Sequence, residues 1–181
     1  MVTTTPLRAV VAYHAVLGST CAAVFVLTTT VLGRLVAEPS ETRSVGAIWA
    51  VVATIYVFHE SAADRRRALV SRLAATTLSF VLCEIYVLLL PFAVWGLAVA
   101  VAVGGVVVTL LGRPEDAGLT AITTTVVLGV VSAAPHEQVW AQPLLRLVDT
   151  AFGALIGFGV ASLRGAAGRA LADREGGRPW A

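Results

Sequence analysis

The sequence has 181 residues, of which 57% are hydrophobic and 13% are charged, and its formal net charge is +2. Soluble domains carry roughly 25% charged residues, so this composition excludes an ordinary soluble globular domain. All thirteen basic residues are arginine. They form no basic stripe interleaved with aromatic side chains, which argues against a nucleic-acid partner.

Six apolar segments follow one another along the chain. Backbone groups in lipid must be hydrogen-bonded within their own segment, so we predict an all-α membrane protein with six transmembrane helices. A crossing takes about 20 residues, which the first, third, fourth and sixth segments provide, whereas the second and fifth are short. The first is also too long for the core of a signal peptide, so we expect a retained helix. The predicted segments are 7–36, 44–58, 68–90, 92–111, 118–134 and 144–163.

The distribution of arginine predicts the orientation of these helices in the membrane. With six crossings, ten arginines fall on the side of the two termini, and only Arg34, Arg43 and Arg146 fall on the other. We therefore expect a multi-pass protein of the cell membrane with both termini in the cytoplasm. Residues 1–165 would form the transmembrane domain, and residues 166–181 a short cytoplasmic tail that is amphipathic or disordered.

Two stretches of the sequence match one another. The third segment contains Arg-Leu-x-x-Thr at 72–76 and the sixth contains it at 146–150, and a His-Glu pair follows each short segment, at 59–60 and 136–137. We interpret residues 7–90 and 92–163 as two repeats. Because each repeat has three crossings, the second would be inverted relative to the first, as in many transporters. Chance matching within helices rich in Ala, Val and Leu is the alternative.

Four ionisable residues lie within or at the rims of the long segments: Arg72, Glu84, Arg146 and Asp149. A charge at the centre of the bilayer costs about 2.5–3.5 kcal/mol on insertion scales, so such residues normally face a partner or a polar cavity. Arg146 and Asp149 are three residues apart and share a helix face. They would form either a local structural ion pair or a pore-facing arginine held by its carboxylate.

Arg72 has two interpretations. By the repeat it would act like Arg146, attracting anions from the cytoplasmic end, whereas its nearness to the arginines at 65–67 favours a positive-inside anchor. Glu84 lies about twelve residues farther along the same segment, near or beyond the middle of the membrane. Its carboxyl group suits reversible protonation, or it is a neutral acid hydrogen-bonded between helices or at a subunit contact.

Other polar and aromatic residues lie in the two short segments. Trp49 and Tyr56 are seven residues apart on one helix face, where they would line a vestibule for aromatic or carboxylate ligands, anchor the helix at the interface, or pack in the core. Thr124, within a run of three threonines, would bond a backbone carbonyl or line a polar path. The sequence contains no metal-ligand cluster, phosphate loop or nucleophile–base arrangement, so we predict neither a cofactor nor an enzyme.

The short Trp49-containing segment followed by Arg-Leu-x-x-Thr resembles the fusaric acid resistance and aromatic acid exporter superfamily. The stretch 146–153, which reads Arg-x-x-Asp-Thr-x-x-Gly, is similar to a pattern typical of that group. The likeness extends from about Val10 to Leu163. The first repeat departs from the pattern, because it has Ala75 and Ser79 where the second has Asp and Gly.

The resemblance implies a six-helix module that exports or conducts small organic anions, including aromatic carboxylates. The superfamily also includes plant malate channels, which are similar in building a pore between two six-helix units. A chain with one such module would therefore form a homodimer in the lipid bilayer, with Arg72 and Arg146 near the permeation path. The competing hypotheses are a non-transporting membrane scaffold or assembly subunit, and an intramembrane enzyme.

Overall fold

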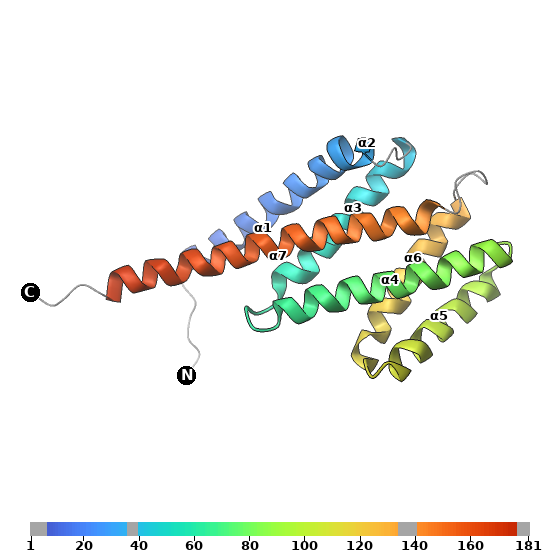
Figure 1. Ribbon diagram of the computed structural model, residues 1–181. Helices are drawn as coiled ribbons and strands as arrows, with labels where there is room; N and C mark the ends of the chain where they lie inside the picture. The colour runs from blue at the N-terminus through green and yellow to red at the C-terminus, as the bar shows by residue number, and fades with distance from the viewer. Residues whose placement is uncertain (1–6, 36–39, 134–140, 177–181) are drawn as a thin grey trace, which may run out of the picture.

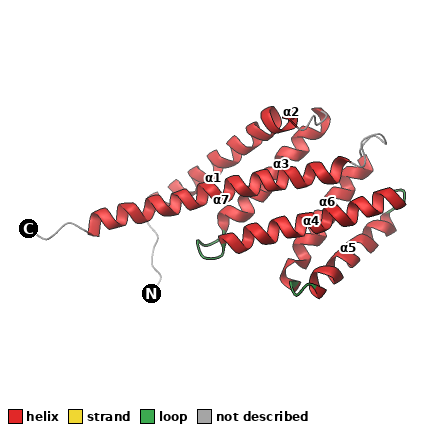
Figure 2. Ribbon diagram, viewed as in Figure 1, coloured by secondary structure: helices red, strands yellow, loops and turns green. Residues whose placement is uncertain are grey.

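The chain folds into a bundle of long helices, and every element of the described residues is helical (Figures 1 and 2). The structure is a computed structural model that describes residues 7–35, 40–133 and 141–176. Its helices are α1 (Leu7–Leu27), a π-helical turn (Thr28–Leu32), α2 (Gly33–Leu35), α3 (Ser40–His59), α4 (Arg65–Leu89), α5 (Val94–Leu110), a 3-10 turn (Pro114–Asp116), α6 (Ala117–Ala133) and α7 (Ala141–Gly176).

Each predicted segment corresponds to one of these helices, so the all-α prediction is confirmed for the described residues. Several boundaries differ, since α3, α4 and α7 begin three or four residues earlier than predicted. The helix α5 has 17 residues, fewer than expected, because Ala93 after Pro91 is extended and Gly112 adopts a positive φ of 76° beyond the other end. Residues 166–176 of the expected tail continue α7.

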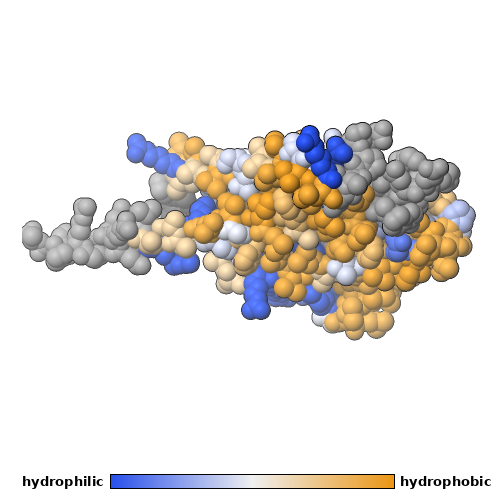
Figure 3. Space-filling view, turned by 45° about the horizontal axis from the view of Figure 1, so that its top comes forward, coloured by the Kyte–Doolittle hydropathy of each residue, from blue (hydrophilic) through white to orange (hydrophobic). Residues whose placement is uncertain are grey.

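Several helices of the bundle are apolar enough to lie in a membrane. Three of them are long and apolar enough to cross a membrane, Leu7–Leu32, Arg65–Leu89 and Pro143–Ala170, and Arg43–His59 and Val94–Leu110 are shorter apolar helices. Large apolar side chains such as Leu88, Val94 and Leu110 are exposed, and apolar residues cover most of the face seen in Figure 3. Exposed apolar surface on this scale requires an apolar surrounding, which lipid provides.

The helices α3 and α7 pack against each other through residues with very small side chains. A Cβ atom added to Gly153 would overlap the backbone carbonyl of Ala50, and one added to Gly157 would lie 2.7 Å from the carbonyl oxygen of Thr54. The hydroxyl of Thr54 donates across this interface to the Gly153 carbonyl at 2.8 Å. The Gly-x-x-x-Gly motif at 153–157 therefore brings two backbones into direct contact, as small residues do between helices in lipid.

Buried positions recur at a constant spacing of 74 residues. On α4 and α7 the buried pairs are Arg72 and Arg146, Ala75 and Asp149, Thr76 and Thr150, Ser79 and Gly153, and Cys83 and Gly157. On α3 and α6 they are Gly46 and Thr120, Trp49 and Thr123, Ala50 and Thr124, Ala53 and Val127, Thr54 and Leu128, and Val57 and Val131. The contacts recur as well, because Ser79 meets Thr124 where Gly153 meets Ala50.

Substitution of Gly153 tests the close contact of α3 and α7. Gly153→Ala should lower the free energy of unfolding by about 1–3 kcal/mol, as overpacking of a filled interface does. Gly159→Ala is the matched control, since nothing lies within 4 Å of a Cβ there and alanine is the better helix former. Thermal unfolding in detergent measures both. Equal stability of the two variants would contradict the packing described.

Candidate functional site

The guanidinium group of Arg72 is buried in the interior of the bundle between two aromatic rings. Its Cζ lies 4.9 Å from the centre of the Trp49 ring and 5.8 Å from that of Tyr56, and Arg72 is only 2% exposed. A cation over an aromatic face gains roughly 0.5–2 kcal/mol. The two rings, predicted to share a face of α3, thus form with Arg72 a cluster that we call the aromatic–arginine site.

Several donors of this site have no hydrogen-bond partner within the described part of the chain. They are Nε and Nη2 of Arg72 and Nε1 of Trp49, all buried. The Nε–H and Nη2–H groups lie on the same edge of a guanidinium and form the parallel pair that binds a carboxylate through two hydrogen bonds. Leaving a buried donor unpaired costs about 1–3 kcal/mol, and more for a charged group. The site therefore has an unmet requirement for an acceptor.

Arg146 is buried in a different way. Its Nη1 lies 2.8 Å from Oδ2 of Asp149, three residues farther along α7, and the two residues are 0% and 2% exposed. Gly46 on α3 provides the space for this pair, since an added Cβ would lie 2.6 Å from Oδ2 of Asp149 and 2.9 Å from Nη1 of Arg146. The local ion pair considered from the sequence is therefore present and lies inside the bundle.

Hydroxyl groups connect the central helices. Thr124 donates to the hydroxyl of Ser79 at 3.1 Å, across the contact of α6 with α4, and Ser79 donates to the backbone carbonyl of Thr120 at 3.2 Å. The neighbours Thr123 and Thr125 instead donate to carbonyls of their own helix at 2.8 and 2.9 Å. Thr124 therefore joins α6 to α4, and none of these hydrogen bonds involves Arg72, Trp49 or Tyr56.

An open cavity of about 260 Å³ lies where the α3–α4 and α5–α6 connections meet. Carboxyl groups outnumber basic groups in its lining, so this cavity does not itself favour an anion. Tyr56 belongs both to this cavity and to the aromatic–arginine site. The lining residues are Tyr56, Glu60, Asp64, Arg67, Ala68, Ser71, Glu115 and Asp116.

Ion pairs join the two connections at the rim of this cavity. Arg67 Nη2 lies 2.7 Å from Glu115 Oε1, and Arg113 Nε lies 2.8 Å from Asp116 Oδ2, while the Ser71 hydroxyl donates to Asp116. The hydrogen bond from its own backbone amide, aided by the one from Arg67, holds the pKa of Glu115 below its usual range. The carboxylate of Glu115 therefore stays charged at neutral pH.

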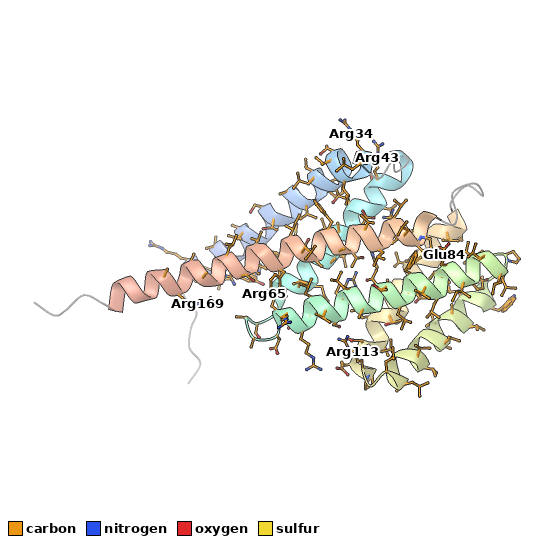
Figure 4. The ribbon with its side chains drawn as sticks, viewed as in Figure 1. Arg34, Arg43, Arg65, Glu84, Arg113 and Arg169 are labelled. Atoms are coloured by element: carbon orange, nitrogen blue, oxygen red, sulfur yellow. The ribbon has the colours of Figure 1, made fainter. Side chains whose placement is uncertain are left out.

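Glu84 lies on α4, twelve residues farther along the helix than Arg72. Figure 4 shows it toward the end of α4 that leads into α5, while Arg65 lies at the opposite end of the helix. Its side chain is partly buried, and Oε2 has no hydrogen-bond partner among the described residues. His136 and Glu137, the second predicted His-Glu pair, lie outside the described residues. The sequence did not single out Gly46, although its identity is what makes room for Asp149.

The comparison with protein families decides the classification. The model of the fusaric acid resistance protein-like family matches residues 35–160, which include the aromatic–arginine site and the Arg146–Asp149 pair. The chain belongs to the fusaric acid resistance protein-like family. No curated protein and no solved structure matches it.

Membership in the fusaric acid resistance protein-like family confirms the resemblance found in the sequence. Family membership and the apolar helices together indicate a membrane protein that functions in transport or resistance. The family is associated with transport and not with catalysis. Among the described residues, no group of three or more His, Cys, Asp or Glu side chains is placed to hold a metal ion.

Removal of the Asp149 charge tests the buried ion pair. Asp149→Asn should lower the free energy of unfolding by about 3–5 kcal/mol, because it leaves a buried guanidinium without its counter-charge. The double variant Arg146→Met with Asp149→Leu should recover most of that loss, since apolar residues of similar volume often replace a buried pair without cost. Chemical unfolding in detergent measures all three proteins. A double variant no more stable than Asp149→Asn would contradict this account.

Proposed function

We propose that this protein is a membrane exporter or channel for small organic anions of the aromatic carboxylate type. The observation that carries the proposal is the aromatic–arginine site, where the paired Nε and Nη2 donors of a buried arginine have no acceptor. A carboxylate supplies two acceptor oxygens in the matching geometry. The rings of Trp49 and Tyr56 provide apolar surface for the remainder of such an anion.

The energetics favour movement of an anion out of the cell. An inside-negative potential expels one negative charge with about 2.3 kcal/mol per 100 mV. The fixed positive charge of Arg72 lowers the cost of dehydrating the carboxylate on the way. No covalent step is required. Because Arg72 is 2% exposed, an anion would reach it only if neighbouring side chains moved, and we expect Tyr56 to move because it contributes both to the aromatic–arginine site and to the cavity at the α3–α4 connection.

We also propose six crossings arranged as two inverted repeats, with both termini in the cytoplasm. Successive helices run back and forth between the two ends of the bundle in Figure 1. The 74-residue spacing of buried positions relates α3 and α4 to α6 and α7. In Figure 4, Arg34 and Arg43 lie together near the start of α3, far from Arg65 and Arg169. The positive-inside rule assigns the side with more arginine to the cytoplasm, and this separation of the arginines supports placing Arg65 and Arg169 on that side.

A homodimer in the cell membrane completes the proposal. Glu84 lies on a helix long enough to span the membrane, yet it is only partly buried within one chain. A carboxyl group in contact with lipid is costly, and a second copy packed over this face of α4 would remove that contact. Glu84 would then lie at or near the interface, where its carboxyl group would be reversibly protonated.

A non-transporting scaffold is the second candidate, and one observation favours it. The Arg146–Asp149 pair is fully buried, as expected for a structural ion pair and not for a pore-lining arginine. In that case Arg72 would serve only to hold α4 against α3 through Trp49 and Tyr56.

Flux measurements separate these two candidates. Purified protein in liposomes should carry current with benzoate as the permeant anion, and Arg72→Gln should lower it at least tenfold. Charge-assisted hydrogen bonds are worth about 1.5–3 kcal/mol each, and about 1.4 kcal/mol corresponds to a factor of ten. Arg169→Gln is the matched control because Arg169 is exposed on α7. Absence of flux for a panel of carboxylates, with or without a pH gradient, would support the scaffold.

Cysteine labelling tests the orientation independently of transport. In a background with Cys21→Ala and Cys83→Ala, Phe92→Cys in the α4–α5 connection should react with a membrane-impermeant maleimide on intact cells. Ala63→Cys in the α3–α4 connection should react only after permeabilisation, because the two connections lie at opposite ends of α4. Both residues are exposed in the fold. Labelling of both positions from outside would overturn the six-crossing arrangement.

A further inference from the structure

Arg72 and Arg146 occupy equivalent places in the two halves of the bundle. They lie 74 residues apart near the start of α4 and α7, and both are almost fully buried. Thr76 donates to the carbonyl of Arg72 at 2.9 Å, and Thr150 donates to the carbonyl of Arg146 at 2.8 Å. The two helices therefore present their arginines from the same local backbone arrangement.

The halves differ in how the arginine charge is balanced. In the second half, Asp149 lies 2.8 Å from Arg146. The equivalent position in the first half is Ala75, which is 2% exposed and carries no charge. Within the described part of the chain Arg72 forms no ion pair, and its Nε and Nη2 have no acceptor. The first half thus lacks the one carboxylate that the second half supplies from its own sequence.

We infer that Asp149 occupies, in the second half, the place that the carboxylate of the transported anion takes in the first. The inference rests on the proposed function and makes it more specific. Arg72 is then the arginine that binds substrate, while Arg146 is neutralised by its own chain. Trp49 adds a further buried donor, Nε1, beside the guanidinium.

This difference determines the class of anion. One arginine with one pair of free donors balances one carboxylate, and a second carboxylate on the same molecule would find Arg146 already paired with Asp149. A buried charge without a partner is strongly disfavoured. The protein should therefore select monocarboxylates with an apolar or aromatic body over dicarboxylates of the same size.

A substitution that gives the first half its own carboxylate tests the inference. Ala75→Asp places an acidic side chain three residues after Arg72, in the relation that Asp149 has to Arg146. A cavity of about 50 Å³ adjoins Ala75, and its lining also includes Arg113 and Asp116 but not Arg72. Ala75→Asn is the matched control, because it has the same shape without the charge.

The readouts are benzoate flux in liposomes and the rise in melting temperature on adding benzoate. In Ala75→Asp, benzoate flux should fall at least tenfold and benzoate should no longer raise the melting temperature. Ala75→Asn should retain both the flux and the rise in melting temperature. If the wild-type protein moves benzoate and Ala75→Asp moves it equally well, the inference is wrong and the proposed function stands. If the wild-type protein moves no carboxylate, the proposed function itself fails.

A second measurement needs no substitution and therefore no altered fold. Benzoate and phthalate share a ring but carry one and two carboxylates. Benzoate should stabilise the wild-type protein at concentrations at least tenfold lower than phthalate does. Phthalate should also be a poor inhibitor of benzoate flux. Equal potency of the two anions would overturn the assignment of a single free arginine, even if Ala75→Asp failed to fold.

Discussion

A buried arginine charge must be compensated, and most of the central packing of this protein follows from that constraint. A guanidinium cannot lose its proton in the interior, so its charge has to be balanced by a partner. Arg146 is balanced by a carboxylate on its own helix, and Gly46 leaves the space in which that pair lies. Arg72 is surrounded by the rings of Trp49 and Tyr56, which attract a cation without supplying a hydrogen-bond acceptor.

Close packing of small residues holds these charges within the bundle. Gly153 and Gly157 bring α7 against the backbone of α3, and the hydroxyls of Ser79 and Thr124 make the related contact between α4 and α6. In lipid the hydrophobic effect does not drive helices together, so packing and interhelical hydrogen bonds must do so. The same contacts fix the rotation of each helix and thereby decide which side chains surround each arginine.

The two arginines consequently differ in whether their side-chain donors are available to bind a ligand. Arg146 is paired with Asp149 on its own helix, whereas Nε and Nη2 of Arg72 have no acceptor among the described residues. The cavity that Tyr56 lines has more carboxyl groups than basic groups, and the ion pairs at its rim join the α3–α4 and α5–α6 connections. For this member of the fusaric acid resistance protein-like family, the arrangement leaves only Arg72 of the two arginines with Nε and Nη2 donors that have no acceptor among the described residues, and this is where we propose that an anion binds.

The sequence by itself determined the all-helical class, the approximate helix limits, the family and the Arg146–Asp149 pairing. The helical class, the helix limits and the pairing depend on composition, on apolar run length and on a three-residue spacing along one helix, all of which are local, whereas the family came from the resemblance of the stretch 146–153 to a known pattern. The short extent of α5 was missed because it depends on the extended backbone after Pro91 and on the positive φ of Gly112. Only the tertiary structure decided that Arg72 lies between Trp49 and Tyr56, that Gly46 faces Asp149, and that Thr124 meets Ser79. Those contacts join different helices, and the rotation and crossing of packed helices are not encoded in the spacing along any one of them.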